Sequence, residues 1–167
     1  MELASHKRIL VVDDEPDIRD FISACLEDAG FEVETAFDGI DALEKIKESI
    51  PDLITLDLVM PRMSGRKLMS TLFEKEEWKK IPVIMITAHA QDEMGQTDVK
   101  ELLKKPSTIA PQHIIDKPIT PAKLVSVVAN ILSVKTELDV ANERQSVLEM
   151  VKSCLPEKLK EIRDILG

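Results

Sequence analysis

Short apolar runs alternate with longer amphipathic stretches over most of the chain. The runs are rich in leucine and in β-branched residues. Short strands separated by segments of helical length are typical of repeated βα units around a parallel sheet. The pattern predicts strands at 9–12, 32–36, 53–56, 83–87 and 114–116. The first, third and fourth of these are nearly all apolar, as expected for strands that helices cover on both faces.

The stretches between the runs carry apolar residues at helical spacing and have recognisable ends. Pro16 stands where the first turn of a helix tolerates proline, and Gly30 supplies a stop for that helix. Asp98 and Glu101 have the spacing of a capping box, so a short helix is expected before Pro106. The pattern predicts helices at about 16–29, 38–50, 65–72, 98–105 and 121–132.

Beyond Ser133 the pattern changes to a charged segment with one apolar seam. Gln145 and Lys152 interrupt the seam, whose apolar residues follow heptad-like steps. These residues are Leu138, Ala141, Leu148, Leu155, Leu159, Ile162 and Leu166. We expect Pro156 to kink or divide the segment. The seam indicates either an extended fifth helix that dimerises or a helical arm folded on its own domain, and we favour self-association. A linker to an output domain is a third interpretation.

Composition narrows the class of protein. The 167 residues give room for one ordinary domain, expected at 1–133, and a helical extension at 134–167. The net charge of −9 opposes binding to nucleic acid, because no basic stripe overrides it. Cys25 and Cys154 lack metal-ligand spacing and are expected to be reduced thiols. The only apolar run near the N-terminus is too short for a signal sequence or a membrane span, so a cytoplasmic protein without a membrane partner is expected.

Residues that can carry chemistry follow four of the predicted strands. Asp13 and Asp14 follow the first strand, and Asp57 follows the third. Thr87 ends the fourth strand, and Lys117 follows the fifth. The carboxyl ends of parallel strands meet at one edge of a sheet, which is where binding sites form. Each fragment alone is a weak signal, but their joint occurrence indicates a single site.

Four stretches make the chain resemble the receiver domains of two-component response regulators: VVDDEPD, DLITLDLVMPRMSG, IMITAHA and IIDKP. The resemblance covers about 7–132. It implies a doubly wound α/β fold, flavodoxin-like, with a five-stranded parallel sheet in the order 2-1-3-4-5. It also implies that Asp57 is phosphorylated. The Mg2+ ligands that it implies are Asp13, Asp14, Asp57 and the backbone carbonyl of Val59.

The chemistry of these residues agrees with the implied roles. Three carboxylates at one place repel one another, and a hard cation such as Mg2+, which prefers oxygen ligands, neutralises them. Asp57 can then act as a carboxylate nucleophile on a phosphoryl donor. Lys117 would contact the phosphoryl oxygens, and the Thr87 hydroxyl would hydrogen-bond another of them. The chain is expected to catalyse only its own phosphorylation and dephosphorylation, and therefore not to be an enzyme acting on other substrates.

The resemblance implies a sensor histidine kinase or a phosphotransfer protein as phosphoryl donor, and a downstream protein effector. The main alternative is an interaction module with the same fold whose binding does not depend on phosphate. A haloacid-dehalogenase phosphatase is disfavoured, because Val59 stands where that class has its second aspartate. A dinucleotide-binding domain is disfavoured because the turn at 12–17 contains no glycine.

The chain departs from the receiver pattern at a few positions. Ile114 stands where the family has an aromatic switch residue, and the chain contains no tyrosine. We therefore expect the signal to depend on the segment 89–112, which is longer than the family's usual connection. Val59 and His89 occupy the positions that in the family tune phosphate hydrolysis. Neither offers a carboxylate or an amide, which predicts a longer-lived phosphate.

Overall fold

The computed structural model describes residues 2–58, 60–88 and 113–166. Within them, five parallel strands form a central sheet in the order β3-β2-β4-β5-β6. The strands are β2 (Arg8–Val12), β3 (Glu32–Ala36), β4 (Leu53–Leu56), β5 (Val83–Thr87) and β6 (His113–Asp116). Counted along the chain, this is the order 2-1-3-4-5. The predicted flavodoxin-like fold is confirmed, with two strands one residue longer than expected.

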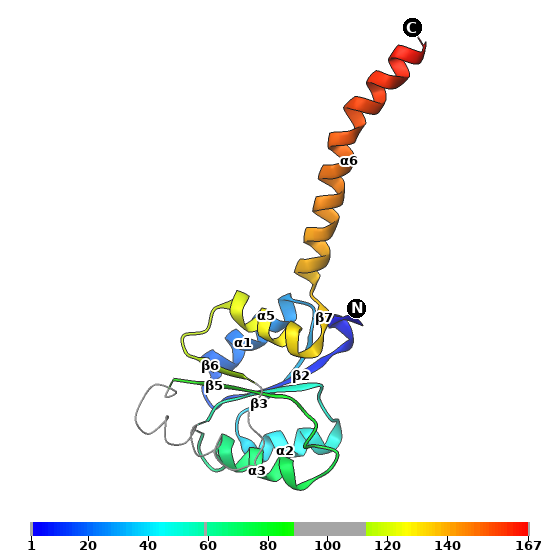
Figure 1. The fold of residues 1–167 in the computed structure, drawn as a ribbon. Coiled ribbons are helices and arrows are strands. Elements are labelled where there is room, and N and C mark those ends of the chain that lie inside the picture. The colour runs from blue at the N-terminus through cyan, green and yellow to red at the C-terminus, as the bar shows by residue number, and fades with distance from the viewer. Residues whose placement is uncertain (1, 59, 89–112, 167) are drawn as a thin grey trace.

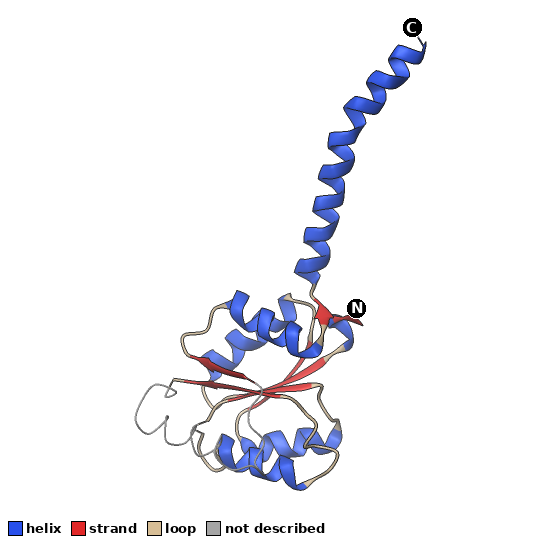
Figure 2. Ribbon diagram, in the orientation of Figure 1, coloured by secondary structure: helices blue, strands red, loops and turns tan. Residues whose placement is uncertain are grey.

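Two pairs of helices cover the two faces of this sheet (Figures 1 and 2). The pairs are α1 (Pro16–Asp28) with α5 (Pro121–Leu132), and α2 (Gly39–Glu48) with α3 (Gly65–Glu74). Alternate residues of β2 pack into the two hydrophobic cores that lie on opposite faces of the sheet. Ile9 and Val11 belong to the core under α1 and α5, and Leu10 and Val12 belong to the other. A strand buried on both faces is nearly all apolar, which is why the pattern of the first run was informative.

The helix ends follow the local signals in the sequence. Asp38 caps α2 by accepting a hydrogen bond from the Asp41 amide at 2.8 Å. Gly30 lies just after the end of α1 and has a φ of 98°, which is in the left-handed region that favours glycine. The helix α5 has the predicted bounds. The predicted helix at 98–105 lies outside the described residues, as does the rest of the segment 89–112.

Two short strands tie the N-terminus to the chain after α5. Strand β1 (Glu2–Leu3), followed by the 3-10 turn η1 (Ala4–His6), pairs in parallel with β7 (Val134–Lys135). Ser133 has a φ of 53° and turns the chain out of α5. Val134 is buried in the core under α1 and α5. The prediction of an extended fifth helix is therefore wrong, because α5 ends before this turn.

The last element, α6 (Glu137–Leu166), is one helix that projects away from the sheet (Figure 1). Pro156 does not divide it. Leu138 is 64% exposed and Met150 is 69% exposed, so the predicted arm folded on its own domain is wrong for the described residues. Among those residues, none of the helices combines the length and the apolar run needed to cross a membrane. Both cysteines are free, as expected.

A reciprocal cap fixes the start of α6. The Thr136 hydroxyl accepts a hydrogen bond from the Asp139 amide at 3.2 Å. The Asp139 carboxylate accepts from the Thr136 amide at 2.9 Å and from its hydroxyl at 2.7 Å. These hydrogen bonds, from the amide first and then from the hydroxyl, lower the pKa of Asp139. The Glu137 amide also donates to the carbonyl of Ala29 at 3.0 Å, which joins α6 to the end of α1.

Replacing Thr136 with alanine is expected to lower the free energy of unfolding by about 1 kcal/mol, the typical cost of losing a helix cap. Guanidinium unfolding followed by circular dichroism measures this change. The lowered pKa of Asp139 means that the cap stabilises above the unfolded-state pKa and is lost as pH falls through the folded-state pKa. The difference between wild type and Thr136→Ala should therefore shrink in acid. Ser153→Ala, on the exposed surface of α6, is the control, and an equal effect of both variants would contradict the cap.

Candidate functional site

The hydrogen-bond ladder of the sheet continues past the ends of three strands and fixes the residues that follow them. The Asp13 amide donates to the carbonyl of Ala36 at 3.2 Å, and the Asp57 amide donates to that of Val12 at 3.0 Å. The Lys117 amide donates to the carbonyl of Thr87 at 3.1 Å. The backbones of Asp13, Asp57 and Lys117 are therefore held at the same edge of the sheet, as the sequence predicted.

Four acidic residues gather at this edge. Asp13, Asp14, Glu15 and Asp57 each offer one carboxylate oxygen, and these oxygens lie within 4.8 Å of one another. Asp13 is only 1% exposed and Asp57 only 6% exposed, so water screens their charges poorly. Glu15 was not predicted as a site residue. It is the third acid of VVDDEPD, and its adjacency to the aspartate pair was the one signal for it.

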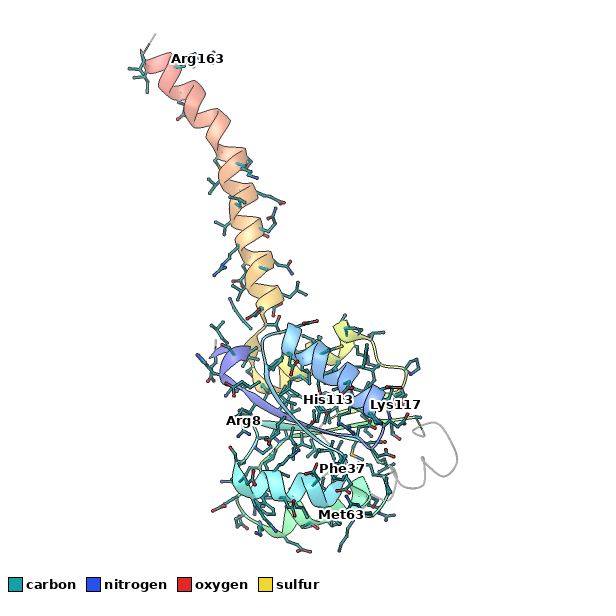
Figure 3. The ribbon with its side chains drawn as sticks, turned by 180° about the vertical axis from the view of Figure 1, so that it is seen from behind. Arg8, Phe37, Met63, His113, Lys117 and Arg163 are labelled. Carbon is teal, nitrogen blue, oxygen red and sulfur yellow. The ribbon has the colours of Figure 1, made fainter. Side chains whose placement is uncertain are left out.

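Lys117, labelled in Figure 3, supplies a positive charge to this cluster. Its Nζ lies 3.2 Å from Asp13 Oδ2, 3.6 Å from Asp57 Oδ2 and 3.6 Å from Glu15 Oε1. Burial by itself would lower the pKa of Lys117, but the charges of Asp57 and Asp13 outweigh it and raise the pKa. The side chain therefore stays protonated and positively charged inside the site.

The carboxylate of Asp13 remains unfavourable in its charged form in spite of these contacts. Its Oδ1 accepts a hydrogen bond from the Glu15 amide at 3.0 Å, and its carbonyl accepts one from Arg19 at 2.9 Å. Burial nevertheless raises the pKa of Asp13, and its hydrogen bond with Glu15 and the charge of Lys117 oppose this rise only in part. One lysine therefore does not compensate the acids, and a further cation would stabilise them.

The chemistry of the site fits Mg2+. The ligand atoms on offer are carboxylate oxygens alone, which is what a hard divalent cation prefers. A buried, undercompensated acid beside a second buried acid adds an electrostatic reason for a cation at this place. Asp13, Asp14 and Asp57 were predicted as ligands, and the structure brings all three together. Val59, the fourth predicted ligand, lies outside the described residues.

Replacing Asp13 with asparagine is expected to have opposite effects on stability and on metal binding. The pKa of Asp13 is raised in the fold, so its carboxylate costs stability above the folded-state pKa, and the acid form does not. Without metal, Asp13→Asn should therefore unfold at the same temperature as the wild type or higher. The free energy of unfolding of the wild type should rise by about 2.7 kcal/mol at a Mg2+ concentration of roughly a hundred times the Kd for Mg2+.

Thermal unfolding with Mg2+ or EDTA measures both effects of Asp13→Asn, and the variant should lose most of the Mg2+-dependent gain. Asp164→Asn, on the exposed surface of α6, is the control for loss of an aspartate charge. A metal-free Asp13→Asn protein that melts well below the wild type would contradict the electrostatic account. Equal stabilisation of wild type and Asp13→Asn by Mg2+ would contradict the ligand role.

Thr87 and Ile114 are the remaining predicted residues that the structure describes. Thr87 is buried at the end of β5, where it pairs in register with Asp116 of the neighbouring strand. Ile114 is half-buried in β6 and packs against the core under α2 and α3, so no aromatic side chain occupies this position. His89 and the segment 89–112 lie outside the described residues, and their predicted roles in signalling and phosphate lifetime stay predictions.

Comparisons with known proteins agree with this arrangement. A family model described as the response regulator receiver domain matches residues 9–129. The hybrid signal transduction histidine kinase D of Dictyostelium discoideum is 34% identical over 138 residues, which are 83% of this chain and 8% of the kinase. The sensor histidine kinase TmoS of Ectopseudomonas mendocina is 34% identical over 139 residues, 83% of this chain and 13% of that kinase. The chain thus spans a small part of these relatives.

A solved structure is similar over nearly its whole length. The chemotaxis protein CheY4 of Vibrio cholerae has a TM-score of 0.64 and 31% identity with this chain. The similarity covers 74% of this chain and 97% of CheY4.

Proposed function

Because the chain belongs to the response regulator receiver domain family, we propose that Asp57 accepts a phosphoryl group from a histidine kinase or a phosphotransfer protein. The observation that carries this proposal is the position of Asp57. Its carboxylate is almost fully buried, 3.6 Å from the ammonium of Lys117 and within the cluster of acids that includes Asp13. A buried carboxylate with a cation beside it is arranged to receive an anionic group rather than to fill a core.

Asp57 is the nucleophile of the proposed reaction. A carboxylate oxygen of Asp57 forms a bond to phosphorus, the bond from phosphorus to the donor's imidazole nitrogen breaks, and the leaving imidazole takes a proton. Lys117 holds its charge throughout and attracts the phosphoryl oxygens. When bound by Asp13, Asp14 and Asp57, Mg2+ supplies further positive charge against the phosphoryl oxygens. The only reactions proposed are the chain's own phosphorylation and dephosphorylation.

Thr87 is the residue proposed to pass on the phosphorylated state. It ends β5, next to the strand from which Asp57 follows, and its hydroxyl is of the right type to donate to a phosphoryl oxygen. Lys117 follows β6, the strand on the other side of β5, and its backbone amide donates a hydrogen bond to the carbonyl of Thr87. A shift of Thr87 would therefore displace groups on both sides of β5. This displacement would change the surface that a downstream protein binds.

Phosphorylation with acetyl phosphate tests the proposal. The protein is incubated with this donor in Mg2+ or in EDTA, and its intact mass is measured. We expect the mass of one phosphoryl group to be added in Mg2+ and little addition in EDTA. The alternative function, binding that does not depend on phosphate, predicts no adduct with either a small donor or a phosphorylated histidine protein. Such a result would contradict the proposal.

We also propose that α6 self-associates. Beyond its capped start the helix exposes several apolar side chains, which is unfavourable for an isolated helix in water. The exposed residues include Leu138, Val147, Leu148, Met150 and Val151. A second copy of the same helix would cover them, and two of them, Leu138 and Leu148, belong to the predicted heptad-like seam. The division of the chain into 1–133 and 134–167 and the cytoplasmic location stay predictions.

Removing residues 145–167 tests the self-association. This truncation keeps the Thr136 cap and the salt bridge between Lys135 and Glu143 at 2.6 Å, so the base of α6 remains intact. Light scattering should give a dimer for the full chain and a monomer for the truncated one, with equal phosphorylation by acetyl phosphate. A full chain that is monomeric at high concentration would contradict the proposal.

A further inference from the structure

An ion pair joins two loops beside the phosphorylation site. Arg62 lies between β4 and α3, and Asp38 lies between β3 and α2. The Arg62 guanidinium contacts Asp38 Oδ2, while Asp38 Oδ1 accepts the hydrogen bond of the Asp41 amide. Asp38 is 1% exposed, so its charge needs a partner inside the protein. Arg62, whose side chain is 56% exposed, provides that partner from the solvent side, so that only the carboxylate of the pair is buried.

Further contacts fix the same two loops against each other. The Arg62 guanidinium lies 5.2 Å from the centre of the Phe37 ring, within the range of a cation-π interaction. Arg62 has a φ of 64°, an uncommon conformation for a residue other than glycine. Met63 packs so closely on Gly39 that a Cβ there would lie 2.6 Å from Met63 Cγ. Figure 3 places Phe37 and Met63 on the side of the sheet that α2 and α3 cover.

The other end of the Arg62 loop is closed on Asp57 itself. The Gly65 amide donates to the carbonyl of Leu58 at 3.1 Å. A Cβ on Gly65 would lie 2.2 Å from the Asp57 carbonyl oxygen, so only glycine allows this approach. The loop therefore starts at Asp57 and returns to its carbonyl at Gly65, and Arg62 at the tip of the loop is held by Asp38. A change at the tip can reach the backbone of Asp57 through this short closed loop.

We infer that Arg62 is a positioning residue for the phosphorylation of Asp57, and this inference rests on the proposed function. The ion pair with Asp38 holds the loop after β4 against the turn after β3. The backbone of Asp57 is thereby kept in place relative to Asp13, which follows the neighbouring strand β2. A misplacement of a reacting group by about 1 Å can cost roughly a hundredfold in rate, and phosphoryl transfer depends on alignment. Arg62 itself touches no reacting atom.

The chain offers a set of variants that separates the ion pair from the helix cap. Asp38→Asn keeps a side-chain oxygen to cap α2 and removes the charge that pairs with Arg62. Arg62→Ala removes the other partner, and Arg62→Lys retains a charge. Arg8→Ala is the matched control, because it breaks an ion pair with Glu34 that has an N–O distance of 2.8 Å at the opposite end of β2.

The rate of phosphorylation by acetyl phosphate at saturating Mg2+ is the readout, with the melting temperature measured in parallel. We expect Arg62→Ala and Asp38→Asn each to lower the rate about tenfold, within the range known for misplaced reacting groups. Arg62→Lys should recover most of the loss, and Arg8→Ala should leave the rate unchanged. The double variant of Arg62 and Asp38 should be no slower than either single variant, because both remove the same contact.

The outcomes distinguish this inference from the proposed function. A wild-type protein that takes up no phosphate overturns both. A wild-type protein that is phosphorylated, with Arg62→Ala equally fast, overturns the inference alone. The inference is also overturned if the variants only lower the melting temperature, or if the losses in the two single variants multiply in the double variant.

Discussion

Asp57→Asn is expected to take up no phosphate from acetyl phosphate under conditions in which the wild type is fully labelled. Asparagine has almost the same shape as aspartate, so the packing at the end of β4 is retained. Its amide is not a nucleophile towards phosphorus, however, and the variant also loses one carboxylate of the acidic cluster. The loss should therefore be complete rather than partial, because no other group replaces the attacking atom.

Intact mass measured over time with acetyl phosphate and Mg2+ checks this expectation. Asp164→Asn removes an aspartate from the exposed surface of α6 and should be labelled like the wild type. Circular dichroism confirms that each variant is folded before the comparison. Labelling of Asp57→Asn at the wild-type rate would mean that another residue is the acceptor.

Lys117→Ala is expected to slow phosphorylation about a hundredfold. Removing one preorganised hydrogen-bond donor that faces the developing negative charge typically costs between about a hundredfold and a thousandfold in rate. Lys117 is a donor of this kind, because its Nζ lies within 3.6 Å of oxygens of Asp13 and Asp57 and its side chain is only 12% exposed. Lys117→Arg keeps the charge with a different shape and should retain more of the rate than alanine does.

The pH dependence gives a second check on Lys117. Its folded-state pKa is raised above the unfolded value, so its charge stabilises the fold below the unfolded-state pKa and this stabilisation is lost as pH rises through the folded-state pKa. The wild type should therefore lose stability in strong alkali from this group, and Lys117→Ala should lack that component. Thermal unfolding over alkaline pH measures it. Phosphorylation of Lys117→Ala at the wild-type rate would contradict the role of the ammonium.

The sequence predicted the central sheet well because buried parallel strands leave a strong signal. The runs that became β2, β4 and β5 are nearly all apolar, since both faces of the sheet are covered. The strands β1 and β7 were not predicted. A pair of two-residue strands has no periodicity to detect, and it depends on the left-handed turn at Ser133 that ends α5. The predicted helical extension is confirmed as α6, which begins at Glu137, three residues later than expected because β7 comes first.

Most of the acidic cluster was predictable because one rule of topology gathers it. Asp13, Asp57 and Lys117 each follow a strand directly, and parallel strands bring these ends together. The ion pair of Arg62 and Asp38 was not predictable in this way. It depends on how two loops pack, and neither residue belongs to a periodic pattern or to a strand end with a recognised role. From the sequence, an aspartate just before a helix predicts only a helix cap.

Mapping the phosphoryl group in the wild-type protein tests the central claim most directly. After incubation with acetyl phosphate and Mg2+, borohydride reduces an aspartyl phosphate to homoserine, and tandem mass spectrometry of the peptides identifies the changed residue. The account predicts conversion at Asp57 and at no other aspartate. Conversion at Asp13, Asp14 or Asp116 with Asp57 unchanged would contradict it.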